Sequence, residues 1–241
     1  MDIRDGNYDY VLSAISNVVE NDDLPMEYFL DIVYEEEKGK VLVDLDLPEI
    51  EDIPTKKIVI TPTGKKSIRS KSQTDIKSDY VSCVFGLSIY VAYVIFNVSL
   101  KIKTIEMTGF TQRQSSNYVS PEDQYVFIVD FDRDTFSSVD FERLTSFQIM
   151  NFFKRYYNMT KSCDLKQIDL SKAFDKMDEY IPINYQTYMS SLPIDQKAEP
   201  EQPTQLPLSY TGETASIAQV SATRTITREL TRDILGNLIR N

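Results

Sequence analysis

The chain has 241 residues, of which 41% are hydrophobic, so it can bury one sizeable core with an appendage or form two small domains. Its formal net charge of −11 argues against binding of nucleic acid or anionic membranes over the whole surface. The sequence contains no histidine, which excludes Ser-His-Asp and Cys-His nucleophiles, histidine general bases and metal sites with histidine ligands.

The first expected elements are two helices. Residues 8–20 carry apolar side chains at i, i+3, i+4 and i+7, which predicts an amphipathic helix that Asn21 and the two following aspartates close. Pro25 suits the first turn of a second, short helix. Its apolar side would consist of Tyr28, Phe29, Ile32 and Val33.

Strands follow these helices. Residues 40–47 alternate between apolar and polar positions, which predicts a strand that Pro48 ends. Residues 56–61 form the next expected strand. A turn then leads into the basic residues 65–69, where a further strand fits.

Residues 80–100, YVSCVFGLSIYVAYVIFNVSL, are the longest run without a formal charge. A run of about 20 apolar residues can cross a bilayer, but small and polar residues dilute this one. We therefore expect no membrane span. The pattern instead predicts a core helix that begins at Thr74 or Asp75, runs to about Asn97, and is covered by a sheet on one side and by helices on the other.

The second half of the domain is predicted to add a hairpin and a helix. Residues 104–113 and 124–131 alternate as two antiparallel strands, and residues 132–140 form a turn. Residues 141–158 are expected to be a second substantial helix, and residues 164–190 to be loops and short turns. The fold class predicted is α+β, with a mostly antiparallel sheet, a buried central helix and the helices on one face.

The domain organisation has three parts. Residues 1–190 form the α+β domain, residues 191–208 a Pro-rich linker, and residues 209–241 an amphipathic helix. A lone amphipathic helix has no core of its own, so it must dock back, pair with itself or insert into a partner, and we favour a partner or self-association. The predicted partner-binding residues are Ile217, Val220, Ile226, Leu230, Ile234 and Leu238.

An acidic cluster gives the alternative, enzymatic interpretation. Carboxylates near a strand end suit Mg²⁺ or Mn²⁺, and a nearby lysine could assist phosphodiester hydrolysis. Nucleases of the restriction type place an acid and an E-x-K triplet on adjacent strands, but here no Glu or Asp stands two residues before Lys56 or Lys57. Acids on the polar side of a strand are also expected to be solvated. We therefore predict no metal and no cofactor, with a metal-dependent nuclease as the alternative. Its candidate residues are Asp44, Asp46, Glu49, Glu51 and Lys56.

A basic stretch from residue 56 to residue 77 follows an acidic one from residue 20 to residue 52. Attraction between neighbouring strands, or charges that protect sheet edges, explains most such patterns, and a site for an anionic partner is the other interpretation. Nucleic-acid binding is weakly supported because no aromatic residues are interleaved with the charges. The candidate anion-binding residues are Lys65, Lys66, Arg69 and Lys71.

Asp130, Asp132 and Asp134 have the D-x-D-x-D spacing that begins calcium loops, but the glycine and the distal glutamate of such loops are missing. We expect a turn in which Arg133 pairs locally. The two cysteines, Cys83 and Cys163, are too few for a disulfide framework or a thiolate zinc site. Because the N-terminal segment is polar and acidic, we expect no signal peptide and a cytoplasmic location.

Two segments resemble known families. VLVDLDLPEIEDIP, YVSCVFGLSIYVAYVIFNVS, EMTGFTQR and DQYVFIVDFDRDTF together resemble a bacterial domain of unknown function that would cover residues 26–170. That family supplies no catalytic residues to carry over. The last helix, ETASIAQVSATRTITRELTRDILGNL, resembles the C-terminal helix of tellurite-resistance-associated TerB-type proteins, which are linked with bacterial stress and phage-defence gene clusters. The resemblances imply a non-catalytic interaction subunit of such an assembly, docking through residues 209–241.

Overall fold

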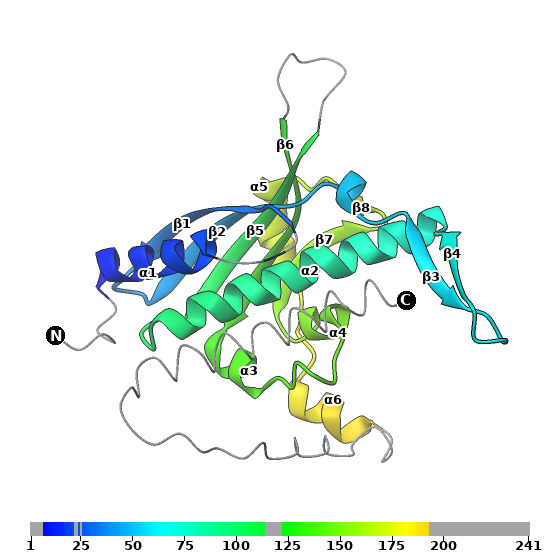
Figure 1. Ribbon diagram of the computed structural model, residues 1–241. Helices are drawn as coiled ribbons and strands as arrows, with labels where there is room; N and C mark the ends of the chain where they lie inside the picture. Colours follow the sequence, from blue (N-terminus) through cyan, green and yellow to red (C-terminus); the bar gives the residue numbers. More distant parts are fainter. Residues whose placement is uncertain (1–6, 22–23, 25, 114–121, 193–241) are drawn as a thin grey trace, which may run out of the picture.

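A computed structural model describes residues 7–21, 24, 26–113 and 122–192 of the chain (Figure 1). Its centre is a six-stranded sheet with the strand order β1-β2-β5-β6-β7-β8. The β2–β5 pair is parallel, and the other neighbouring strands are antiparallel. The predicted α+β class with a mostly antiparallel sheet is therefore confirmed. The strands are β1 (Phe29–Glu35), β2 (Lys40–Asp46), β5 (Thr104–Arg113), β6 (Glu122–Asp132), β7 (Lys154–Met159) and β8 (Leu165–Lys166).

The long helix α2 (Gln73–Val98) forms the crossover between the parallel strands β2 and β5. Parallel neighbours need a long connection, and this one also contains the short 3₁₀ helix η1 (Ile50–Asp52) and a separate hairpin. Ser72, rather than Thr74 or Asp75, is the N-cap. Its Oγ accepts the Asp75 N–H at 3.1 Å, and the Asp75 carboxylate accepts the Ser72 N–H at 3.2 Å.

The predicted core position of this helix is confirmed. By length and composition α2 could cross a membrane, with a mean hydropathy of 2.0 over its most apolar window, but 78% of that window is buried inside the fold. The Phe85 side chain is fully buried and packs against the rings of Phe127 on β6, Tyr157 on β7 and Phe147 on α4 (Ser146–Met150). The sheet therefore covers one side of α2, and α4 covers another.

Helix α1 (Tyr8–Glu20) also packs on this side of the sheet, and the helix predicted at residues 8–20 is confirmed. Asn7 caps it by accepting the Asp9 N–H at 3.0 Å. Val11 and Ile15 are fully buried in the main core. The short helices α3 (Arg133–Ser138) and α6 (Tyr185–Ser191) add aromatic side chains to the same core.

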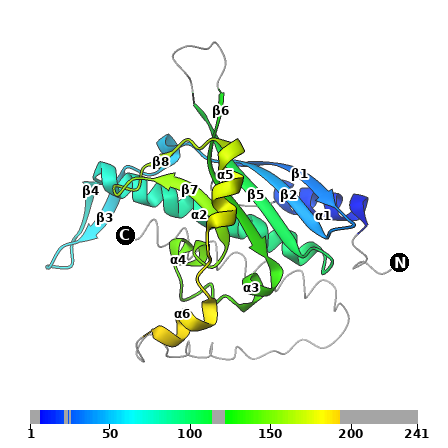
Figure 2. The same ribbon diagram turned by 180° about the vertical axis from the view of Figure 1, so that it is seen from behind.

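Helix α5 (Leu170–Glu179) lies on the opposite face of the sheet, over β6 and β7 (Figure 2). Ala173 and Met177 of this helix form a small second core with Ile128 of β6 and Ile168. Ile128 faces away from Phe127 and Val129 because successive strand residues point to opposite faces. The expectation that all helices lie on one face is therefore wrong.

Three local predictions are also wrong. The short helix expected after Pro25 is the edge strand β1, whose even-numbered residues face the main core. The turn expected at residues 132–140 contains α3, and the loops expected at residues 164–190 contain β8, α5 and α6.

The helix predicted at residues 141–158 is also wrong, because this segment contains α4, a turn and β7. Hydrogen bonding of β7 to β6 fixes the second half as a strand. The predicted linker at residues 191–208 and the helix at residues 209–241 lie outside the described residues, apart from Ser191 and Leu192.

Candidate functional site

A β-hairpin stands apart from the central sheet. Strands β3 (Lys56–Ile60) and β4 (Lys66–Ser70) form a two-stranded antiparallel sheet of their own. It projects from the body beyond the N-terminal end of α2 (Figure 1). The turn between the strands is closed by the Thr61 N–H, which donates to the Lys65 carbonyl at 2.9 Å, and Gly64 supplies the positive φ of 77° that the turn requires.

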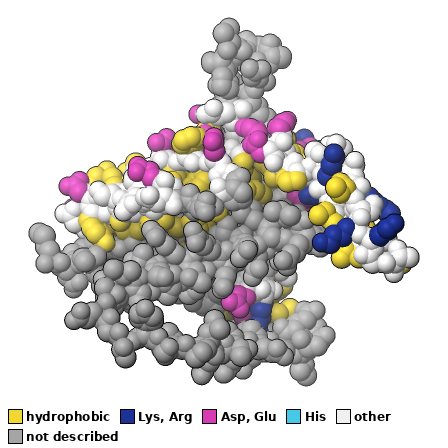
Figure 3. Space-filling view, viewed as in Figure 1, with side chains coloured by type: hydrophobic (Ala, Val, Ile, Leu, Met, Phe, Trp, Pro, Cys, Tyr) yellow, Lys and Arg dark blue, Asp and Glu magenta, His cyan; other side chains and the backbone are white. Residues whose placement is uncertain are grey.

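One side of this hairpin is apolar and exposed. In its register Ile58 lies opposite Ile68, and Ile60 lies opposite Lys66. The side chains of Ile58, Ile60 and Ile68 are 53%, 68% and 72% exposed. Lys56 shares their side because alternate residues point the same way. We call the three isoleucines the isoleucine face; hydrophobic and basic side chains are interspersed on the hairpin in the space-filling view (Figure 3).

The base of the hairpin is tied to the start of α2. The Lys57 ammonium pairs with Asp75 at 3.0 Å, and the Lys71 ammonium pairs with Asp79 at 2.6 Å. The Lys71 side chain is only 3% exposed, and its backbone N–H donates to the Thr55 carbonyl. These contacts hold the hairpin out from the body, and no described element covers its tip.

The structure divides the predicted anion-binding group. Lys65, Lys66 and Arg69 are exposed, whereas Lys71 is buried in its ion pair and cannot serve with them. Together with Lys56 the three exposed residues form what we call the basic group. None of its members makes an ion pair within the part of the chain that the structure describes.

A second surface lies on the α5 side of the sheet. Helix α5 covers β6 and β7, whereas no described helix covers this side of β1 and β2 (Figure 2). Phe29 and Val33 of β1 are 67% and 53% exposed there, with Asp31 between them. Their partners on β2 extend this surface, which we call the β1–β2 face. Those partners are Asp46, Asp44 and Leu42, which lie opposite Phe29, Asp31 and Val33.

The β1–β2 face is negatively charged. Asp44 accepts hydrogen bonds from the Thr108 hydroxyl at 2.7 Å and the Tyr125 hydroxyl at 2.8 Å. Burial, followed by the hydrogen bond to Asp44, raises the pKa of Tyr125 to about 12. The pKa of Asp46 is raised by burial and by the neighbouring carboxylates Asp123 and Asp44.

These acids have no cationic partner among the described residues. Among the described residues, Asp31, Asp44, Asp46 and Asp123 form no ion pair. Like charges therefore lie close together on a surface that no described helix covers.

The acids of the nuclease alternative have different surroundings. Asp44 and Asp46 lie on the β1–β2 face, whereas Glu49 precedes η1 and accepts the Gln112 N–H at 2.8 Å. Glu51 is exposed on η1, and Lys56 lies on the hairpin. Within the described residues no group of three or more acidic or cysteine side chains could hold a metal ion. The nuclease alternative stays a prediction that no such grouping supports.

Arg133 does not pair with the neighbouring acids as expected. Its Nη2 donates to the carbonyls of Phe96 at 2.9 Å and Ser99 at 2.6 Å, and its Nε donates to the Ile102 carbonyl. The guanidinium thus satisfies carbonyl groups at the C-terminal end of α2. Asp132 is the N-cap of α3, with its carboxylate accepting the Thr135 N–H at 2.8 Å.

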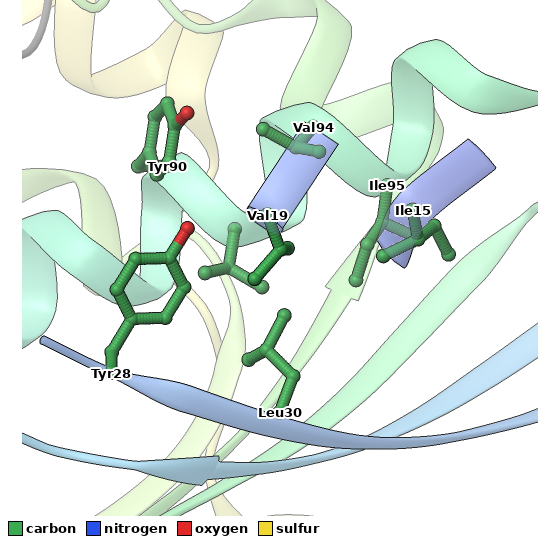
Figure 4. Close-up of a pocket in the computed structure, with 8 residues that line it drawn as sticks. Ile15, Val19, Tyr28, Leu30, Tyr90, Val94 and Ile95 are labelled. Carbon is green, nitrogen blue, oxygen red and sulfur yellow. The ribbon is translucent and has the colours of Figure 1, made fainter. Parts of the chain in front are cut away.

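An apolar gap between α1, α2 and the start of β1 offers no ligand site. Apolar side chains and two tyrosines line it, including Ile15 and Val19 of α1 and Leu30 of β1 (Figure 4). The space between them is too small to admit a water molecule. The gap is therefore a packing imperfection of the core.

Sequence reasoning missed both exposed apolar surfaces, although signals for them are present. Residues 29–35, FLDIVYE, alternate apolar and acidic residues on one side and carry apolar residues on the other, as an edge strand with an exposed apolar side would. Residues 56–60, KKIVI, have apolar residues on both sides, one of which must remain uncovered in a two-stranded ribbon.

The described structure is thus an α+β protein with two exposed surfaces of opposite charge, each containing apolar side chains. Comparison with protein-family models, curated proteins and solved structures gives no match. The resemblances to a bacterial domain of unknown function and to TerB-type proteins stay predictions.

Proposed function

We propose that this protein is a non-catalytic interaction subunit and that the β3–β4 hairpin is a docking element. The supporting observation is the isoleucine face, where Ile58, Ile60 and Ile68 are each more than half exposed on a ribbon that stands away from the core. Exposed apolar side chains that adjoin one another are typical of protein-interaction sites, whereas isolated ones are common on any surface.

Physical chemistry favours a covered hairpin over an uncovered one. A two-stranded hairpin by itself is marginally stable in water. Full burial of an isoleucine side chain contributes about 1.5–3 kcal/mol relative to exposure. A partner that covers this face therefore forms a stabilised complex with the ribbon. The free edges of β3 and β4 also offer backbone groups to an added strand.

The predicted C-terminal helix is a second docking element in this proposal. Its six apolar residues, Ile217 to Leu238, lie outside the described residues. By its resemblance alone we place the subunit in a bacterial stress or phage-defence assembly. Deletion of residues 209–241 is expected to abolish that assembly and leave the domain folded, which size-exclusion chromatography and circular dichroism would measure. Unchanged assembly after the deletion would remove this second element from the proposal.

The hairpin is tested by crosslinking in the source cells followed by mass spectrometry. The full chain is compared with the double variant Ile58→Asp, Ile68→Asp and with the control Ile181→Asp, at a position that is 85% exposed on a loop. The hairpin variant is expected to lose a crosslinked companion, either a copy of itself or another protein, that the control retains. An identical crosslinking pattern for all three chains would contradict the proposal.

A further inference from the structure

We propose that the hairpin docks on a second copy of this chain, with the isoleucine face of one copy, and Lys56 and Lys66 beside it, packing on the β1–β2 face of the next. This inference rests on the proposed function, because it names the partner of the same hairpin. It requires that the two surfaces fit in charge, in spacing and in position.

The charges of the two surfaces are complementary. On the side of the isoleucine face the hairpin presents Lys56 and Lys66. The β1–β2 face presents Asp31, Asp44 and Asp46, and Asp123 of β6 lies near Asp46. Neither set is neutralised within the described residues. An opposite charge brought close favours the charged form of a carboxylate, so a lysine above this face would relieve the repulsion that the acids exert on one another.

The spacing of the two surfaces is also complementary. On each, cross-strand pairs follow one another at every second residue, about 6.6–6.8 Å apart. The hairpin places the pair Ile58–Ile68 next to the pair Ile60–Lys66. The sheet places the pair Val33–Leu42 next to the pair Asp31–Asp44.

Stacking the apolar pairs therefore brings Lys66 of the hairpin to the acidic pair of the sheet. With Ile58 and Ile68 over Val33 and Leu42, the pair Ile60–Lys66 lies one pair further along, over Asp31 and Asp44, so that the Lys66 ammonium approaches the two carboxylates. Two sheets stack face to face at about 10 Å, which is within the reach of a lysine side chain that points to the opposite sheet.

The β1–β2 face of one copy cannot cover the hairpin of the same copy. The hairpin and the β1–β2 face lie toward opposite ends of the molecule in both ribbon views (Figures 1 and 2). A contact between two different surfaces is head-to-tail, so each copy donates a hairpin and accepts another. Repetition of this contact gives a ring or a filament.

The test is sedimentation velocity of the purified full chain over a range of concentrations, with two charge-reversed variants. The hairpin-reversed variant carries Lys56→Glu and Lys66→Glu, the two basic residues on the side of the isoleucine face; the face-reversed variant carries Asp31→Lys and Asp123→Lys. All four positions are exposed, so the fold should survive, which thermal unfolding checks. Wild type is expected to form species larger than a monomer, and each variant alone to associate at least about tenfold more weakly because like charges then meet.

The decisive experiment is sedimentation of an equimolar mixture of the two charge-reversed variants. In the mixture each acidic hairpin meets a basic face and each basic hairpin meets an acidic face, so assembly is expected to return to the wild-type level. A variant with Ile58→Ser and Ile68→Ser should remain dissociated in any mixture. Association of wild type should also fall with added salt. Assembly that is unchanged by charge reversal, or not restored by mixing, would overturn the inference.

The remaining outcomes separate the inference from the proposed function. Assembly lost in a tail variant with Ile226→Asp and Leu230→Asp, but kept in the hairpin-reversed variant, would assign self-association to the tail and overturn the inference. A wild-type chain that stays monomeric while the hairpin variant still loses a crosslinked companion in cells would overturn the inference and leave the proposed function standing. A monomer without a hairpin-dependent companion would overturn both.

Discussion

Helix α2 and the β3–β4 hairpin are neighbours in the chain and are rich in the same apolar residue types, yet their surroundings differ completely. Phe85 and Ile95 of α2 are fully buried, whereas Ile68 of the hairpin is 72% exposed. Sheet and helices cover α2 within one molecule, and no described element covers the isoleucine face. Apolar composition alone therefore does not decide whether a segment is buried, because burial also needs other elements to pack on it. For the hairpin, we infer that a second molecule packs on its apolar face.

Substituting alanine for a large apolar side chain in each region should give the largest difference in the free energy of unfolding. Phe85→Ala is expected to lower the free energy of unfolding by about 3–5 kcal/mol, because it leaves a cavity between α2, α4 and the sheet. Ile68→Ala should change the free energy of unfolding of the monomer by about 0.5 kcal/mol or less. Urea unfolding at a concentration where the chain is monomeric measures both. Equal losses would mean that the isoleucine is already packed within one molecule.

The C-terminal end of α2 should be the next most sensitive place. Arg133→Met removes donors to the Phe96, Ser99 and Ile102 carbonyls, and should cost about 2–3 kcal/mol because hydrogen bonds to a charged group are lost. Arg133→Lys should recover only part of this, because an ammonium lacks the planar fork. Arg69→Met on the hairpin is the matched control and should have little effect. Thermal unfolding distinguishes the three, and equal melting temperatures for Arg133→Met and Arg69→Met would contradict this role.

The junction between the two regions should respond more weakly. Ser72→Ala removes the N-cap of α2 and should cost about 1 kcal/mol. Ser70→Ala, two residues earlier on β4, is the control and should change the unfolding free energy by less than half as much, because Ser70 is exposed. If urea unfolding shows the same loss for both variants, Ser72 does not cap the helix.

The smallest effect should depend on pH. Because burial and the carboxylates of Asp123 and Asp44 raise the pKa of Asp46 above its ordinary value of 3.8, the folded chain binds this proton more tightly than the unfolded chain does. Its charge therefore destabilises the fold above the raised pKa, and the penalty disappears as the pH falls below the ordinary value. Asp46→Asn should be more stable than wild type at pH 7 and equal to it near pH 3. A difference that is constant between pH 3 and pH 7 in thermal unfolding would contradict this.

Elements with a local signal could be predicted from the sequence. The uncharged run of residues 80–100 predicted the core helix, and alternation predicted the strands at residues 40–47, 56–61, 104–113 and 124–131, all of which are confirmed. These patterns repeat within a few residues, so they depend little on the rest of the chain.

The errors arose where distant contacts decide the structure. In residues 141–158 a short helix followed by a strand imitates helical spacing, and pairing of β7 with β6 is visible only in three dimensions. At β1 the alternation was present, but Pro25 suggested a helix start.

The candidate site depends on distant contacts as well. The sequence identified the basic residues of the hairpin, but the burial of Lys71 against Asp79 and the exposure of Ile68 follow from how the hairpin stands on α2.

Hydrogen exchange of the full chain, measured as a function of protein concentration, tests most directly whether a second copy covers the hairpin. Backbone amides of β3, β4 and β1 should exchange more slowly as the concentration rises, because the isoleucine face and the β1–β2 face become covered and the strands open less often. Amides in the middle of α2 should exchange at a rate that does not depend on concentration. Hairpin amides whose exchange is equally independent of concentration, over the range in which sedimentation shows assembly, would contradict the account.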